Sequence, residues 1–136
     1  MRFVIAAVIG LSLAAQSVDT FKTRLSAVPA DTKSRQEITG IGSVTAVLSG
    51  TKLSINGTFE GLKTAATVAR LHDGLATGVR GPAIQDLNVS KATSGTVTGT
   101  LDLTAEQVDH VKKGRFYVQI HSEKAPEGNL WGWLLR

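Results

Sequence analysis

The sequence contains no cysteine, so disulfide bonds, thiolate metal sites and cysteine nucleophiles are all excluded. A domain without disulfides is held together by its core alone. In an exported protein, this composition is more typical of a bacterial periplasm than of a eukaryotic extracellular space.

The chain also has few histidines and a small net charge. The 136 residues include three histidines and carry a formal net charge of +4. The basic residues are scattered, and Lys112-Lys113 is their only adjacent pair, so no basic stripe for nucleic acid is present. The sequence shows no nucleophile elbow, phosphate loop or pair of acid/base carboxylates. We therefore expect neither enzymatic activity nor a cofactor.

No apolar run is long enough to span a bilayer, which takes about 20 residues. The longest run covers residues 3–13, follows the positive charge of Arg2, and ends in the small residues that a signal peptidase reads. We predict a signal peptide at residues 1–15, with a retained N-terminal anchor as the alternative. Residues 16–136 then form a single domain without a transmembrane segment, located in the bacterial periplasm or secreted.

Alternation of apolar and polar residues dominates after residue 20. The segment 52–62 is the clearest, because Leu53, Ile55 and Phe59 alternate with Ser54 and Asn56. The same pattern predicts further strands at 21–25, 42–49, 64–72, 83–89, 95–103, 115–121 and 129–135.

One short helix is expected at 104–113. Thr104 and Gln107 have the spacing of a capping box, and Gly114 is suited to the left-handed residue that ends a helix. His110 lies beside lysines on this helix, and we expect it to be exposed. Short strands with one brief helix predict an all-β protein, an antiparallel sandwich or barrel of Greek-key type.

The last strand carries the two tryptophans of the chain. Its alternation separates a core-facing set from an outward-facing set: Leu130, Gly132 and Leu134 against Asn129, Trp131, Trp133 and Leu135. Two neighbouring indoles on an outward face form the kind of apolar patch that monomeric proteins rarely leave uncovered. The pattern therefore indicates a docking surface.

Several segments resemble a known family in their order and spacing: residues 21–25 (FKTRL), 69–74 (ARLHDG), 78–82 (GVRGP), 95–99 (GTVTG), 117–122 (YVQIHS) and 132–134 (GWL). Over about residues 21–134 the chain resembles the CHRD domain, a module named from chordin and found in short exported bacterial proteins. The resemblance implies an immunoglobulin-like sandwich, distantly similar to copper/zinc superoxide dismutase, with no agreed biochemical activity.

The chain departs from this family at two places. The family usually has histidine where Arg70 stands, which would pair with His72 on one face of a strand, whereas arginine cannot ligate a metal. The family also usually has Glu, Arg and Gln at the positions of Asn129, Trp131 and Trp133. Those polar residues imply an outward face, which in this chain has become aromatic.

His72 and His121 fall at the ends of strands that are expected to be neighbours. We favour a structural role, in which each imidazole bonds to the backbone of a loop. The alternative is a copper or zinc site completed by Asp73 or Glu123, although two histidines without a third firm ligand make a poor site. Three histidines are too few for superoxide dismutase chemistry.

The sequence therefore predicts a non-enzymatic exported domain that binds another exported or membrane-associated protein, as an accessory subunit of a larger assembly. The expected interface residues are Trp131, Trp133, Asn129 and Leu135, with Tyr117 at the rim. The alternatives are a metal-binding or redox-related protein that uses His72 and His121, and polysaccharide binding by stacked indoles. A further alternative has the loop at residues 26–37 fold over both tryptophans and bury them.

Overall fold

The computed structural model describes residues 18–136, and the predicted signal peptide lies outside the described residues. The described chain forms eight strands and one helix: β1 (Val18–Ala27), β2 (Ile41–Ser49), β3 (Lys52–Glu60), β4 (Ala66–Asp73), β5 (Ala83–Val89), β6 (Gly95–Asp102), α1 (Ala105–Lys112), β7 (Phe116–Ser122) and β8 (Ala125–Trp133). The predicted all-β class and the single short helix are confirmed.

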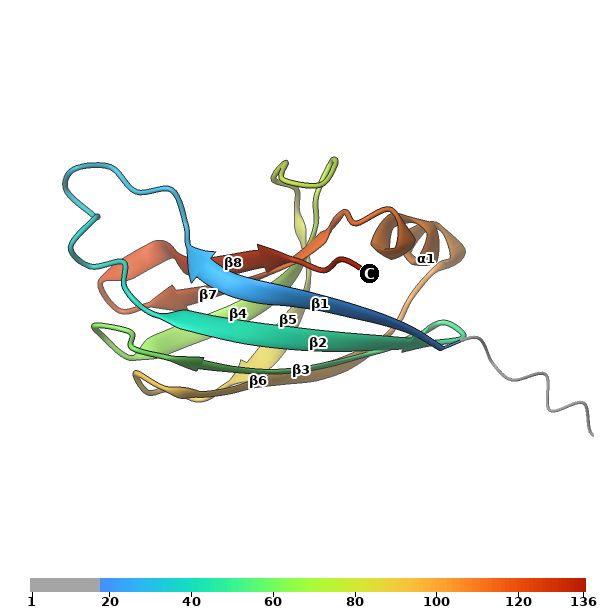
Figure 1. Ribbon diagram of the computed structural model, residues 1–136, viewed down its shortest axis with the longest axis horizontal. Coiled ribbons are helices and arrows are strands. Elements are labelled where there is room, and N and C mark those ends of the chain that lie inside the picture. Colours follow the sequence, from blue (N-terminus) through green and yellow to red (C-terminus); the bar gives the residue numbers. More distant parts are fainter. Residues whose placement is uncertain (1–17) are drawn as a thin grey trace, which may run out of the picture.

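The strands close into an antiparallel barrel in the order β1-β2-β3-β6-β5-β4-β7-β8 (Figure 1). Strands β3 and β6, and β4 and β7, are neighbours although they are not consecutive, which is a Greek-key arrangement. The expected sandwich is corrected to a closed barrel, because two short pairings join the halves of the sheet. Ser26 and Ala27 of β1 pair with β8, and Asn88 and Val89 of β5 pair with β6.

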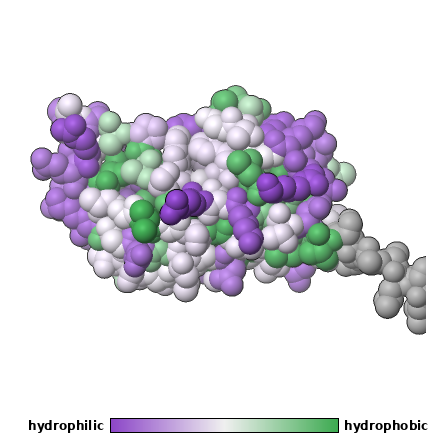
Figure 2. Space-filling model, in the orientation of Figure 1, coloured by the Kyte–Doolittle hydropathy of each residue, from purple (hydrophilic) through white to green (hydrophobic). Residues whose placement is uncertain are grey.

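The barrel interior is the hydrophobic core. On β3, Leu53, Ile55 and Phe59 are buried while Ser54 and Asn56 are exposed, as the alternation predicts. Surface hydrophobic residues in the view of Figure 2 form small patches between hydrophilic side chains. No helix within residues 18–136 has the length and apolar character needed to cross a membrane.

Helix α1 begins with the predicted capping box. The Thr104 hydroxyl accepts a hydrogen bond from the Gln107 amide at 3.1 Å, and the Gln107 side chain accepts one from the Thr104 amide at 3.0 Å. Gly114 has φ +73°, as expected after a helix end. The predicted exposure of His110 is wrong, because its side chain is 12% exposed and its Nδ1 lies 2.7 Å from a carboxylate oxygen of Asp73.

Candidate functional site

Strand β8 has the predicted orientation. Leu130 and Leu134 are buried in the core, whereas Trp131 and Trp133 lie on the outer face and are partly exposed. Gly132 faces inward where β1 crosses closely. A Cβ atom there would stand 2.5 Å from the carbonyl oxygen of Arg24, so only glycine permits this approach.

The outer face carries a cluster of aromatic rings that runs across three strands. His72 of β4, Tyr117 of β7 and Trp133 of β8 are in register, and both neighbouring pairs of ring centroids are 4.5 Å apart. Trp131 meets the edge of Trp133 at 4.7 Å. The guanidinium of Arg80, from the loop between β4 and β5, lies 4.3 Å from the centre of the Trp131 ring. We call these five residues the aromatic cluster.

Two of the expected interface residues are buried within the chain itself. Tyr117 is 1% exposed, and its hydroxyl donates to the Gly81 carbonyl at 3.1 Å and accepts from the Gly81 amide at 3.2 Å. Asn129 is fully buried, accepts a hydrogen bond from the Ser122 hydroxyl at 2.8 Å, and donates to the Thr39 carbonyl at 2.8 Å. Both residues hold loops in place and present no area to a partner.

The other three expected interface residues remain accessible. Trp131 and Trp133 are partly exposed, and Leu135 is 46% exposed. Of the loop expected at residues 26–37, Ser26 and Ala27 belong to β1 and pair with Trp131 and Leu130 of β8, and the Val28 amide donates to the Asn129 carbonyl at 3.1 Å. The ring contacts of the indoles come instead from Tyr117, from each other and from Arg80 of the β4–β5 loop.

Both candidate metal-binding histidines bond to backbone carbonyls, His72 to the β4–β5 loop and His121 to the start of β8. His72 Nδ1 lies 3.0 Å from the Gly81 carbonyl oxygen, and His121 Nδ1 lies 2.8 Å from that of Pro126. A carbonyl oxygen only accepts hydrogen bonds, so Nδ1 of each ring carries the proton that is donated to it. Both Nε2 atoms are buried without a partner.

The surroundings of His72 on the outer face also shift its pKa. Burial lowers the pKa of this imidazole below its usual value, and the charges of His121, Arg70 and Arg80 act in the same direction, while the Gly81 hydrogen bond opposes them. The ring is therefore neutral at pH 7.

Gln119, between the two histidines on the outward side, donates to the Glu127 carbonyl at 3.0 Å and keeps a buried, unpartnered oxygen.

The carboxylates expected to complete a metal site are engaged elsewhere or exposed. Asp73 pairs with His110 at 2.7 Å and lies 3.7 Å from Arg115, and Glu123 is exposed. Within residues 18–136, no three His, Asp or Glu side chains gather at metal-binding distance. Arg70, which replaces the histidine usual in the resembling family, pairs with Asp86 at 3.0 Å.

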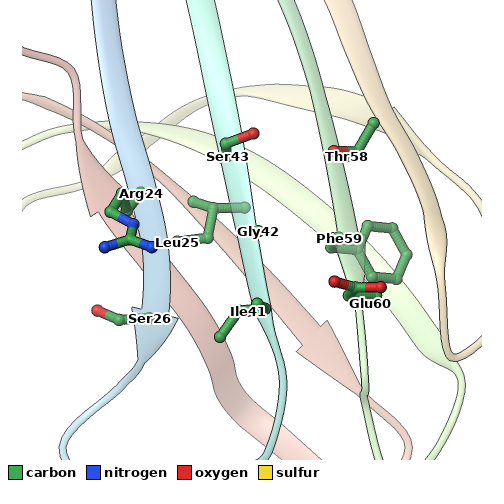
Figure 3. Close-up of a pocket in the computed structure, with 9 residues that line it drawn as sticks. All are labelled: Arg24, Leu25, Ser26, Ile41, Gly42, Ser43, Thr58, Phe59 and Glu60. Carbon is green, nitrogen blue, oxygen red and sulfur yellow. The ribbon is translucent and has the colours of Figure 1, made fainter.

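A separate hollow of about 760 Å³ lies on the outer side of β1, β2 and β3 (Figure 3). Arg24 on β1 and Glu60 on β3 border it, with the exposed Ile41 of β2 between them. Its remaining side chains are hydroxyl-bearing or apolar, and its floor includes the backbone at Gly42. One acid and one base on different strands do not form a catalytic constellation.

Sequence reasoning missed Arg80 and Gln119. Arg80 lies eight positions after His72 in a glycine-rich loop, and no sequence pattern in that loop predicts that the loop returns over β8. Gln119 was recognisable only as an outward residue of its strand, because its buried state depends on the first residues of β8, where the Glu127 carbonyl accepts its hydrogen bond.

Comparison with known proteins agrees with the resemblance seen in the sequence. No curated protein and no solved structure matched the chain. The family model for the CHRD domain matches residues 21–134, which is most of the chain. This protein therefore belongs to the CHRD domain family.

Proposed function

We propose that this CHRD domain is a non-enzymatic exported module that docks on another exported or membrane-associated protein through Trp131 and Trp133. The observation that carries the proposal is the position of both indoles on the outer face of β8, in contact with each other and partly exposed. Indoles combine a large apolar area with a hydrogen-bond donor, which is why they anchor interfaces. The exposed Leu135 extends the same strand face.

The packing of the indoles supports a rigid anchor. Trp133 stacks on the buried Tyr117 ring, and Trp131 is held between Trp133 and Arg80. A side chain that is already ordered loses less conformational entropy when a partner covers it. The Trp133 indole N–H is buried without an acceptor, so its polar group does not contribute to the accessible surface.

A non-enzymatic role is supported by how the titratable residues are used. Asp73 is paired with His110 and Arg115, and Asp86 is paired with Arg70. These acids stabilise loops and strand ends, and they are not free to act on a substrate. An accessory subunit of a periplasmic or membrane-associated assembly fits a small domain of this kind with a predicted signal peptide.

The test compares a double variant with a matched surface variant. Trp131→Gln/Trp133→Gln removes both indoles, whereas Val18→Gln removes a 58% exposed apolar residue at the end of β1 far from Ser26, the residue that pairs with Trp131. Wild type and Val18→Gln should retain the same protein from an envelope extract of the native host, and the double variant should lose it. The purified partner should then bind wild type directly in a two-component titration.

Circular dichroism and thermal unfolding check that the double variant is folded. Retention of the same partner by a folded double variant would refute docking through the indoles. A wild-type protein that is monomeric and retains nothing would also refute it. Quenching of tryptophan fluorescence by added glycans, without a protein partner, would reassign the face to polysaccharide binding.

One observation favours a second candidate function, binding of copper or zinc by His72 and His121. In metal sites, a ligating imidazole usually donates its other N–H to a backbone carbonyl, and both rings do so here. Their Nε2 atoms are buried and unpartnered. The cation of Arg70 on the same strand opposes metal binding.

Elemental analysis of protein purified without chelators tests this candidate. Stoichiometric copper or zinc should be lost in His72→Ala and in His121→Ala, and kept in His110→Ala, whose histidine pairs with Asp73. Metal content that is absent from wild type, or equal in all three variants, would exclude the site.

A further inference from the structure

A small cavity adjoins the aromatic cluster. It has a volume of about 330 Å³ and lies between the β1–β2 loop and the turn that leads from β7 into β8. Its apolar lining comes from both sides: Val28, Pro29, Ile38, Ala125 and Pro126. Arg80 lines the cavity and also covers the Trp131 ring, so the cavity and the docking face share a side chain.

Two cations line this cavity, Arg80 and Lys124, and both are exposed. Neither forms an ion pair within residues 18–136, whereas Arg70, Arg115 and Lys113 each pair with a carboxylate there. A guanidinium that rests one face on an aromatic ring keeps its in-plane N–H groups for a carboxylate. The Trp131 contact therefore holds Arg80 in position for an anionic group.

The opposing charges limit what this group can be. Glu127 also lines the cavity and has no ion pair within the described chain, so the lining carries a net charge of about +1. The Ser34 hydroxyl in the lining donates to Asp31, so it is engaged within its own loop. The apolar walls suit the methylene groups of an acidic side chain, which an inorganic phosphate does not have.

We propose that this cavity receives an acidic side chain, aspartate or glutamate, from the protein that docks on Trp131 and Trp133, with Arg80 and Lys124 as its partners. The inference rests on the proposed docking function and specifies the chemistry of the partner. The indoles supply apolar contact, and the cavity beside them selects for an acidic residue of the partner at a fixed distance from the apolar residues that cover the indoles.

The probe is a blocked peptide of six glutamates, with a blocked peptide of six glutamines as its neutral match. Trp131 and Trp133 are the only tryptophans in the chain, so a change of tryptophan fluorescence reports binding next to them. Only the glutamate peptide should change the signal, and its affinity should fall as salt is raised, because exposed charges are screened.

Single neutralised variants locate the site. Arg80→Gln and Lys124→Gln should each weaken binding of the glutamate peptide by roughly 5- to 10-fold, the scale of one hydrogen bond or ion pair at an exposed site. Lys91→Gln, in the turn between β5 and β6, removes the same charge outside the lining of the cavity and should leave affinity within about 2-fold. Glu127→Gln should strengthen binding, because it removes the repelling carboxylate.

Equal binding of both peptides, or equal weakening by Lys91→Gln and Arg80→Gln, would overturn the proposal. Tighter binding of inorganic phosphate than of the glutamate peptide would reassign the cavity to a phosphate group and also overturn it. The docking function fails separately. If the partner is lost in Trp131→Gln/Trp133→Gln but kept in Arg80→Gln/Lys124→Gln, docking stands and the acidic side chain is refuted.

Discussion

Replacing Asn129 by alanine separates a structural role of this residue from the interface role that its outward position predicts. The Asn129 amide accepts from the Ser122 hydroxyl and donates to the Thr39 carbonyl, both at 2.8 Å. Ser122 and Asn129 are fully buried. Asn129→Ala removes both hydrogen bonds and leaves the Ser122 hydroxyl without this partner in a place that water does not reach.

The magnitude follows from these two bonds. Each contributes about 1 kcal/mol net, and a buried polar group left without a partner costs about 1–3 kcal/mol. We therefore expect Asn129→Ala to lower the free energy of unfolding by roughly 2–4 kcal/mol, out of about 5–15 kcal/mol for a domain of this size. The melting temperature should fall by about 10 °C.

Urea and thermal unfolding measure this loss, and two further variants sharpen it. Asn56→Ala removes an exposed asparagine from the outer face of β3 and should change the free energy of unfolding by less than about 0.5 kcal/mol. Asn129→Asp keeps an acceptor for Ser122 but cannot donate to the Thr39 carbonyl when ionised. It should be less stable than Asn129→Ala at pH 7 and should recover at lower pH, where the protonated carboxyl donates again.

The reasoning would be refuted if Asn129→Ala unfolded within 0.5 kcal/mol of wild type. A variant of unchanged stability that no longer retained the partner would instead place Asn129 in the interface.

Three further changes have defined outcomes. Gly132→Ala should lower the urea midpoint by an amount equivalent to at least about 2 kcal/mol, because its Cβ would stand 2.5 Å from the carbonyl oxygen of Arg24. An unchanged midpoint would contradict that contact. Tyr117→Phe should lower the free energy of unfolding by only about 1 kcal/mol, because one hydroxyl is lost. Amide hydrogen exchange near Gly81 should become faster, since that hydroxyl bonds both the amide and the carbonyl of Gly81. Exchange equal to wild type would mean that other contacts hold the loop. Burial lowers the pKa of His72 below its usual 6.5, so below that pH the unfolded chain takes up a proton that the folded chain refuses. The stability advantage of wild type over His72→Phe should therefore shrink as pH falls from 7 to 5 in urea titrations, and a constant difference would show that the pKa is not lowered.

The local structure of this chain could be predicted because each element has its own signal. Alternation of Leu53 and Ile55 with Ser54 identified β3, and the capping box at Thr104 marked the start of α1. Gly50, which has φ +62°, forms the tight turn that joins β2 to β3. These signals depend on neighbours in sequence, so no tertiary information was needed.

Closure of the barrel could not be predicted in the same way. It depends on pairings of only two residues each, and one of them, which includes Ser26 with Trp131, joins strands that are far apart in sequence. The start of β8 was also missed, because the strand begins at Ala125 and includes Pro126, which lacks an amide hydrogen. Proline is tolerated there because the pairing of β7 with β8 shifts register between Ile120 and Ser122.

The outward face of the sheet shows why a candidate site is harder to predict than a fold. The side of the sheet on which Tyr117, Asn129 and Trp131 lie follows from alternation, and the structure has all three on the outer side. Their exposure does not follow from it, because two loops return over this face and cover Tyr117 and Asn129 while leaving Trp131 accessible.

The residues that fix those loops therefore define the docking surface as much as the indoles do. The Gly81 backbone is bonded by Tyr117 and His72, and it places the adjacent Arg80 over Trp131. A change that frees Gly81 would move the guanidinium without touching either tryptophan. Partner binding should then respond to Tyr117→Phe, a change at a buried residue that no partner contacts, whereas the free energy of unfolding changes by only about 1 kcal/mol. In an interface built directly from exposed side chains, partner binding would not change when such buried residues are replaced.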